Sequence, residues 1–157
     1  MNNIAVFADV QNIYYTTRQT YSRQFNYREF WRQITVLGDV AQATAYAIDR
    51  GDAGQLKFQS ALKQIGFHIK LKPYIQRRDG SAKGDWDVGI TIDVLDAAVA
   101  VDVVVLLSGD GDFDLLLDKI RDSHGVETHV YGVPDLTANS LIKAASVFHP
   151  IDEALLL

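Results

Sequence analysis

The chain has 157 residues, of which 48% are hydrophobic and 22% charged, a composition typical of one soluble globular domain and not of a disordered chain. It contains no cysteine, which excludes disulfide bonds, cysteine-bound zinc and iron–sulfur clusters, and its formal net charge is -5. No apolar stretch approaches the ~20 residues of a membrane span, and the start of the chain lacks the positive charge of a secretory signal. We therefore expect a cytoplasmic protein with no membrane association.

Short apolar runs alternate with helical patterns along the chain, which is typical of βαβ units and a parallel sheet. In chain order, the sequence predicts a strand at 4–8, a helix at 27–37, a strand at 41–48, a helix at 55–65, a strand at 67–74, a helix at 87–99, a strand at 102–107, a helix at 113–124, a strand at 126–131, a helix at 137–145 and a short strand at 147–151. Residues 75–84 show no periodicity, so we expect a loop there. The fold class is therefore α/β with a central, mostly parallel sheet.

Polar side chains follow the two strands that we expect to be central neighbours. Asp9 and Asn12 follow the first strand, and Ser108, Asp110 and Asp112 follow the strand at 102–107. Parallel sheets bind ligands at the carboxyl ends of their strands, beside the point where the strand order reverses. These side chains are therefore candidates for a functional site, although acidic residues after a strand also serve as ordinary helix caps.

A third acidic cluster, Asp85 and Asp87, stands at the start of the helix at 87–99, which also carries Asp93. Crowded carboxylates raise one another's pKa unless a cation neutralises them. With oxygen donors and no histidine close in the sequence, such a cluster suits Mg2+ or Mn2+ better than zinc or copper. Asp93 does not share a helical face with Asp87, so it is either a residue that supports the site or a surface residue.

Three segments in this order resemble the motifs of NYN domains of the LabA-like branch: Asp9-Val10-Gln11-Asn12, Lys83-Gly84-Asp85-Trp86-Asp87-Val88 and Ser108-Gly109-Asp110-Gly111-Asp112-Phe113. The resemblance extends from residue 4 to about residue 148. NYN domains belong to the PIN-like nuclease superfamily. The resemblance implies one NYN/PIN-like domain over residues 1–157, a three-layer, Rossmann-like α/β sandwich, and a ribonuclease that hydrolyses RNA phosphodiester bonds with Mg2+ or Mn2+.

The same resemblance assigns roles to individual residues. Asp9, Asp87 and Asp110 match the family's acidic positions, and Asp112 follows as a fourth acid. All four are expected to be metal ligands and catalytic residues. Asn12 and Ser108 match the family's polar helpers and are expected to orient a phosphate or a water molecule. Trp86 stands where the family often has an aliphatic residue, and the sequence leaves open whether Asp85 or Asp87 points into the site.

The basic residues are concentrated in the middle of the chain, since residues 57–83 contain seven lysines and arginines and one acid, Asp79. The expected RNA-binding residues of this segment are Lys72, Arg77, Arg78 and Lys83. A second group mixes arginine with tyrosine: Arg18, Arg23, Arg28, Arg32, Tyr14, Tyr15 and Tyr21. The alternative for both groups is that they are ordinary solvent-exposed residues with no role in RNA binding. Single-stranded RNA is the expected partner, because no motif that reads a duplex groove is present.

Two other functions fit parts of the pattern. A haloacid dehalogenase-like phosphatase also uses a strand-end Asp and a late acidic motif, but it needs a second Asp two residues after the first, where this chain has Gln11. A non-catalytic RNA-binding or regulatory module with the same fold would keep the same acids. The terminal residues 155–157, all leucine, fit either a packed end or an interface, so the oligomeric state stays open, with a homodimer as one outcome.

Overall fold

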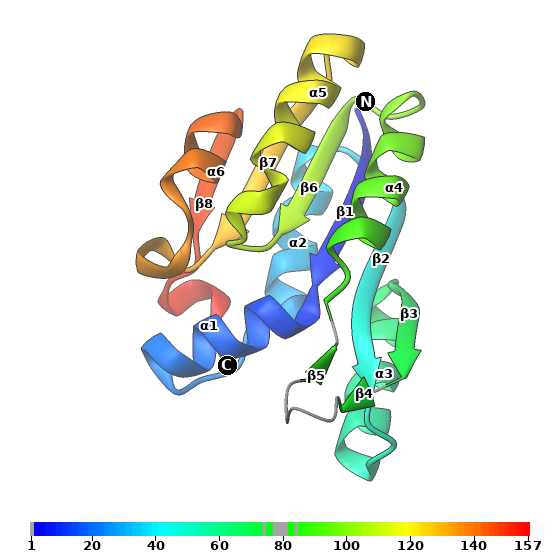
Figure 1. Cartoon of the computed structure of the whole chain (residues 1–157), viewed down its shortest axis with the longest axis vertical. Coiled ribbons are helices and arrows are strands. Elements are labelled where there is room, and N and C mark those ends of the chain that lie inside the picture. The colour runs from blue at the N-terminus through cyan, green and yellow to red at the C-terminus, as the bar shows by residue number, and fades with distance from the viewer. Residues whose placement is uncertain (1, 74, 77–81, 84) are drawn as a thin grey trace.

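The computed structural model describes residues 2–73, 75–76, 82–83 and 85–157 (Figure 1). The strands of its central sheet are β1 (Asn3–Asp9), β2 (Asp39–Asp49), β3 (His68–Pro73), β6 (Val103–Leu107), β7 (Glu127–Gly132) and β8 (Val147–Pro150). They lie in the order β3-β2-β1-β6-β7-β8, and every neighbouring pair is parallel. The expected α/β class with a parallel central sheet is confirmed and is consistent with a PIN-like fold.

Helices cover both faces of this sheet. They are α1 (Val10–Tyr21), α2 (Tyr27–Leu37), α3 (Ala53–Ile65), α4 (Asp87–Ala98), α5 (Asp114–His124) and α6 (Asn139–Ala144). Helices α4, α5 and α6 lie on the face toward the viewer in Figure 1, and α2 and α3 lie behind the sheet. Short 3-10 helices complete the fold: η1 (Gly111–Phe113), η2 (Pro134–Leu136) and η3 (Glu153–Leu155).

The strand order reverses between β1 and β6, which pair directly with Val6 opposite Val105. From β1 the chain adds β2 and β3 on one side, and from β6 it adds β7 and β8 on the other. The carboxyl ends of β1 and β6 therefore flank the crevice in which open α/β sheets bind ligands. This confirms that the two strands predicted to be central are neighbours.

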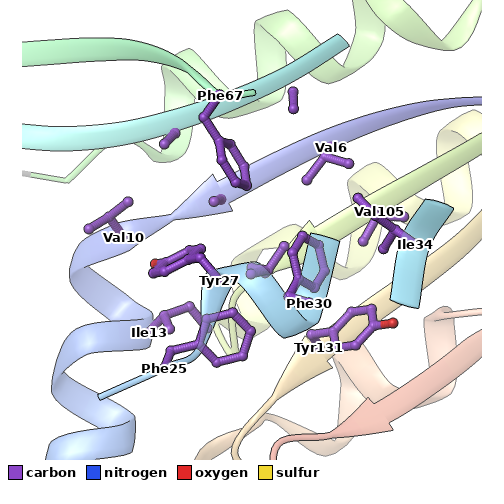
Figure 2. Packing of buried hydrophobic residues seen from close by; sticks show 14 of the residues in the cluster. Val6, Val10, Ile13, Phe25, Tyr27, Phe30, Ile34, Phe67, Val105 and Tyr131 are labelled. Carbon is purple, nitrogen blue, oxygen red and sulfur yellow. The ribbon is translucent and has the colours of Figure 1, made fainter. Parts of the chain in front are cut away.

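Aromatic side chains fill the core on the α2 side of the sheet (Figure 2). Helix α2 begins at Asn26, whose side chain accepts a hydrogen bond from the Glu29 amide, and it buries Tyr27, Phe30 and Ile34 along one face. This spacing of three and four residues is that of an amphipathic helix. The ring of Phe30 meets that of Tyr131 in β7 edge-on at 4.9 Å, so α2 is fixed against the sheet.

Most predicted elements are confirmed with boundaries shifted by one or two residues, but two segments differ. No element was predicted for residues 10–21, which form α1. A loop was expected at 75–84, whereas β4 (Ile75–Gln76) and β5 (Ala82–Lys83) form an antiparallel pair there; residues 77–81 and 84 lie outside the described residues. Strands of two residues are too short to produce a recognisable alternation.

The end of the chain packs into the protein, since Leu155 and Leu156 are buried while Leu157 is exposed. Leu157 donates its amide hydrogen to the Gln24 carbonyl, which holds this end beside α2. Of the three terminal leucines, two therefore belong to the core on the α2 side. None of the helices in the described part of the chain combines the length and the apolar character that a membrane span requires.

Candidate functional site

Asp9 is the last residue of β1 and lies in the crevice between β1 and β6. One carboxylate oxygen accepts a 3.4 Å hydrogen bond from the Asn12 amide and thereby caps α1. The other accepts a 3.3 Å hydrogen bond from the Ser108 hydroxyl, which comes from the end of β6. Asp9 is 9% exposed and Ser108 is fully buried, so this carboxylate is almost fully enclosed where β1 and β6 end.

The loop after β6 is organised by hydrogen bonds among the predicted residues. The Ser108 hydroxyl accepts from the Asp110 amide at 3.1 Å, and the Asp110 carboxylate accepts from the Asp112 amide at 2.9 Å. The side-chain oxygen of Asn12 accepts from the Gly109 amide at 2.9 Å. Asn12 and Ser108 therefore join the two strand ends and fix where the carboxylates lie.

Gly109 allows a second loop to pack closely against this one. A β-carbon at position 109 would lie 2.7 Å from the Leu136 carbonyl oxygen, and the Gly109 carbonyl accepts a 3.1 Å hydrogen bond from the Ala138 amide. A side chain here would push the two loops apart. The connection between β7 and α6 thus packs against the loop after β6 and supports it. This contribution was not predicted from the sequence.

Asp87 reaches the site from α4, and its position depends on Trp86. The Trp86 indole donates a 2.9 Å hydrogen bond to the Ala47 carbonyl, and its ring meets Tyr46 edge-on at 5.3 Å. The carboxylate of Asp85 accepts a 3.2 Å hydrogen bond from the Asp87 amide, which closes the turn just before α4. The large aromatic residue at position 86 is therefore an anchor for the turn that begins α4.

The structure brings the carboxylates of Asp87, Asp110 and Asp112 together, with one oxygen of each within 4.8 Å of the others. These three residues come from α4, the β6 loop and η1, and they lie next to Asp9. Asp85 is not in this group; its carboxylate accepts a hydrogen bond from the Asp87 amide in the turn before α4. Between the two alternatives left open by the sequence, the geometry favours Asp87 as the residue that enters the site.

Burial and crowding disfavour the ionised form of these acids. Burial raises the pKa of Asp9 to about 6, against the opposing hydrogen bonds from Asn12 and Ser108. Burial also raises the pKa of Asp87 to about 7, and the negative charge of Asp110 and a hydrogen bond with it add to the shift. Among the described residues, none of the ion pairs involves either carboxylate.

This chemistry fits a divalent cation. The converging groups are hard carboxylate oxygens, and their negative charge has no ion-pair partner in the described part of the chain. Mg2+ and Mn2+ prefer such oxygen ligands, and their charge removes the repulsion that raises the pKa of Asp87. Asp87, Asp110, Asp112 and Asp9 could therefore hold one or more such ions.

Asp93 contacts a different set of groups. Its carboxylate accepts 2.7 Å hydrogen bonds from the Tyr46 hydroxyl and from the Lys70 ammonium. Burial by itself would raise the pKa of Asp93. The hydrogen bonds from Lys70 and Tyr46 and the positive charge of Lys70 outweigh this effect and hold the pKa below its usual value. Since Tyr46 also packs against Trp86, Asp93 supports the anchor of the α4 turn and is not part of the carboxylate group.

The predicted RNA-binding residues are only partly described. Lys72 lies beside the site, where its ammonium donates a 3.0 Å hydrogen bond to the Asp85 carbonyl and sits 4.5 Å above the Trp86 ring. The backbone of Lys83 lies in β5. Arg77 and Arg78, and the side chain of Lys83, lie outside the described residues. Lys72 thus steadies the α4 turn, a role that its position in the basic segment did not reveal.

The fold and the acidic crevice together define a PIN-like α/β domain. The model of the NYN domain family matches residues 3–152, so the chain belongs to the NYN domain family, whose PIN-like relatives include nucleases. The chain is similar to the low amplitude and bright protein LabA of Synechococcus elongatus, with 25% identity over 137 residues that cover 82% of this chain and 72% of LabA. The resemblance to the LabA-like branch is confirmed.

Solved structures agree with the fold. A protein of unknown function from Vibrio parahaemolyticus RIMD 2210633 is 51% identical, with a TM-score of 0.94 and coverage of 99% of this chain and 96% of that one. A carbohydrate kinase from Agrobacterium tumefaciens is 14% identical with a TM-score of 0.52, and the match covers 94% of this chain and 60% of the kinase. At that level of identity, the kinase shares the sheet architecture alone.

Proposed function

We propose that this protein is a ribonuclease that hydrolyses RNA phosphodiester bonds at the acidic crevice with Mg2+ or Mn2+. The observation that carries the proposal is the convergence of Asp87, Asp110 and Asp112 beside Asp9 in a member of the NYN family. NYN domains are RNA-related, and PIN-like nucleases use divalent metals. Single-stranded RNA is the proposed substrate, because no helix in the described part of the chain stands out as one that would enter a duplex groove.

The side chains divide into ligands and positioning groups. Asp9, Asp87, Asp110 and Asp112 would hold the ion or ions. Without an ion, the pKa of Asp9 is raised to about 6 and that of Asp87 to about 7, so protons compete with the ion for these two carboxylates most strongly below neutral pH. When bound, a divalent ion polarises a phosphoryl oxygen and lowers the pKa of a coordinated water. Ser108 and Asn12 keep these ligands in place through the bonds between the ends of β1 and β6.

Hydrolysis requires an attacking water on one side of the phosphorus and the departing ribose oxygen on the other. The water oxygen forms the new P–O bond, the bond to the departing oxygen breaks, and a proton passes from the water to the departing group or to solvent. The protein's contribution is to hold the phosphate in a fixed orientation among groups that are already ordered, which lowers the entropic part of the barrier.

The test is an assay of the purified chain on labelled single-stranded RNA with and without Mn2+. We expect cleavage that requires the metal and that is lost in Asp110→Asn, since the amide keeps the shape of the side chain but removes its charge. Asp122→Asn provides a matched control: Asp122 is an exposed acid near the end of α5 and pairs with Arg121 at 3.3 Å. This variant should cleave as the wild type does.

The outcomes separate the two functions that share this fold. Metal-independent cleavage, or equal activity of Asp110→Asn and the wild type, would contradict the assignment of the site. RNA binding with no cleavage at saturating Mn2+ would instead favour the non-catalytic module. Binding of Mn2+ alone, measured by calorimetry on the wild type and on Asp110→Asn, tests the ligand role without reference to activity.

A further inference from the structure

Two neighbouring tyrosines on α1 are exposed to solvent: Tyr14 is 43% exposed and Tyr15 is 48% exposed. Their rings meet edge-on with centroids 5.4 Å apart. The buried residues of α1 are Val10, Ile13 and Thr17, and neither tyrosine is among them, so both rings reach the surface of the protein. Exposed aromatic rings have no use in the packing of this helix, and they offer flat faces to a ligand.

Arginine side chains accompany these rings. The Arg18 guanidinium carbon lies 5.7 Å from the centroid of the Tyr14 ring, and Arg18 also donates to the Tyr14 hydroxyl. Arg50, from the connection that follows β2, donates a 3.4 Å hydrogen bond to the Tyr15 hydroxyl. With Gln19, these residues line a surface hollow of about 480 Å3. The hollow therefore combines aromatic faces with two positive charges.

This hollow lies on the same edge of the sheet as the carboxylates. Helix α1 begins directly after Asp9, which caps it, and Tyr15 is only one helical turn beyond Asn12. At 1.5 Å per residue, the tyrosines lie about 8–9 Å along the helix from Asp9. Arg50 follows the carboxyl end of β2, the strand that pairs with β1. A single strand whose phosphate reached the carboxylates could thus place a neighbouring nucleotide at the tyrosines.

We propose that Tyr14, Tyr15, Arg18 and Arg50 form a subsite that binds a nucleotide of single-stranded RNA next to the phosphate at the acidic crevice. This inference rests on the proposed function. The tyrosine rings stack on the base, and the guanidinium groups contact the adjoining phosphates. Stacking accepts any base, because every base presents a flat π-face, so the subsite binds RNA without strong sequence preference. The two arginines also offset the repulsion between RNA and the carboxylates.

The test measures the binding of a short fluorescein-labelled RNA by anisotropy, in the Asp110→Asn background so that the RNA stays intact. The Tyr14→Ala, Tyr15→Ala double variant should bind about 5- to 100-fold more weakly, the range expected when base stacking is removed. The Tyr14→Phe, Tyr15→Phe variant retains the rings and should bind within a few-fold of the parent. An RNA with abasic sites should bind the parent and the double alanine variant equally.

The arginines are tested by salt dependence. Replacing Arg18 and Arg50 with alanine should lower the slope of log K against log salt by about 1.4, or about 0.7 for each phosphate that no longer meets a guanidinium group. The matched control replaces Lys119 and Arg121 with alanine, because these exposed residues of α5 belong to neither group of candidate RNA-binding residues and Arg121 pairs with acids of its own helix. This control removes the same charge and should keep the parental slope.

The results separate this inference from the proposed function. Wild-type cleavage with Mn2+ together with unchanged binding by the double alanine variant would overturn the subsite and leave the ribonuclease intact. Weakened binding by that variant, with no cleavage by the wild type, would support the subsite and overturn the ribonuclease. Failure of the parent to bind RNA, together with no cleavage by the wild type, would overturn both. Equal weakening by the phenylalanine and alanine variants would also overturn stacking as the mode of binding.

Discussion

The indole nitrogen of Trp86 donates a 2.9 Å hydrogen bond to the backbone carbonyl of Ala47 in β2. Trp86 stands between Asp85 and Asp87, so this bond ties the turn that carries Asp87 to the central sheet. Ligands held in position by neighbouring groups bind an ion more tightly than ligands that must be ordered when the ion arrives. Trp86 thereby acts on the proposed metal centre through the backbone of the turn.

Replacing Trp86 with phenylalanine should therefore lower both stability and metal affinity. Loss of the hydrogen bond to Ala47 should reduce the free energy of unfolding by about 0.5–1.5 kcal/mol. The affinity for Mn2+ should fall about 10-fold or more, as expected when a group that orients ligands is removed. Urea denaturation and calorimetric titration measure the two effects.

Trp31→Phe is the matched control for this variant. Trp31 packs against Phe67 with ring centroids 5.2 Å apart, in the core on the α2 side of the sheet. It should lower stability without changing the affinity for Mn2+. Equal Mn2+ affinities of Trp86→Phe and the wild type would show that the anchor does not influence the metal centre.

The fold could be predicted from the sequence largely because its two central strands, β1 and β6, are almost continuously apolar. Residues 103–107 are buried on both faces of the sheet, and such a run has few alternatives to a central strand. Helix α1 could not be identified in the same way. Only two of its three buried residues, Val10 and Ile13, are apolar, so the core face of this helix offers little apolar signal although it has helical spacing.

The acidic residues of the site could be predicted from the sequence, but the groups that hold them in position could not. Strand ends in the sequence locate Asp9 and Asp110, because the topology of parallel sheets brings such ends together. The partner of Trp86 is a backbone carbonyl 39 residues earlier, and no local pattern encodes a contact across that separation. Asn12 was expected to orient a phosphate or a water molecule, and this stays a prediction; the structure adds that its side-chain oxygen accepts a hydrogen bond from the Gly109 amide.

Asp9→Asn should stabilise the metal-free protein while it abolishes cleavage. Burial raises the pKa of Asp9 from 3.8 to about 6, so at pH 8 the folded protein carries an ionised carboxylate whose burial lowers the free energy of unfolding. Asparagine keeps the shape without this charge, and the free energy of unfolding should rise by about 1–3 kcal/mol. Urea denaturation at pH 8, with EDTA present, measures the change.

Asp52→Asn is the control, because Asp52 also caps a helix, through the Gln55 amide, but is exposed. Asparagine is about as good a helix cap as aspartate, so this variant should change stability by only a few tenths of a kcal/mol. A loss of stability in Asp9→Asn would mean that the hydrogen bond with Ser108 outweighs the cost of the buried charge. Wild-type activity of Asp9→Asn at saturating Mn2+ would remove Asp9 from the ligand set.

The stability of the metal-free protein should fall as the pH rises from about 4 to about 7. The pKa values of Asp9 and Asp87 are raised from 3.8 to about 6 and about 7, so in this window the folded state binds more protons than the unfolded state. Stability decreases with pH wherever the folded state holds the extra protons. Saturating Mn2+ should weaken or reverse this trend, because the cation replaces the protons.

Thermal melting between pH 4 and pH 8, with EDTA or with Mn2+, checks this expectation. The melting temperature in EDTA should decline most steeply around pH 5, where the folded state holds both protons and the unfolded state holds neither, and the decline should flatten above pH 7. The stabilisation by Mn2+ should grow as the pH rises towards 7, because fewer protons then compete with the ion. The Asp9→Asn variant should show a shallower decline, since one of the two groups is gone. A stability in EDTA that rises steadily to pH 8 would contradict the raised pKa values.

The basic segment at 57–83 has a net charge of +6 and lies next in sequence to an acidic site that repels RNA. If Arg77, Arg78 and Lys83 contact phosphates, replacing all three with alanine should weaken RNA binding. The slope of log K against log salt should fall by about 2, at about 0.7 for each phosphate of a single strand that is no longer neutralised. The affinity for Mn2+ should change little, because these side chains are not ligands. Asp110→Asn should show the opposite pattern, with abolished metal binding and retained, salt-sensitive RNA binding.

The matched control removes three positive charges elsewhere, by replacing Lys119, Arg121 and Lys143 of α5 and α6 with alanine. General attraction between a positive surface and RNA would make both triple variants lose affinity alike, because long-range attraction depends on net charge. Direct phosphate contacts would lower the salt slope only in the Arg77, Arg78 and Lys83 variant. Unchanged affinity and slope in that variant would assign the segment to solvated surface, and the binding of RNA would then depend on the subsite of Tyr14, Tyr15, Arg18 and Arg50.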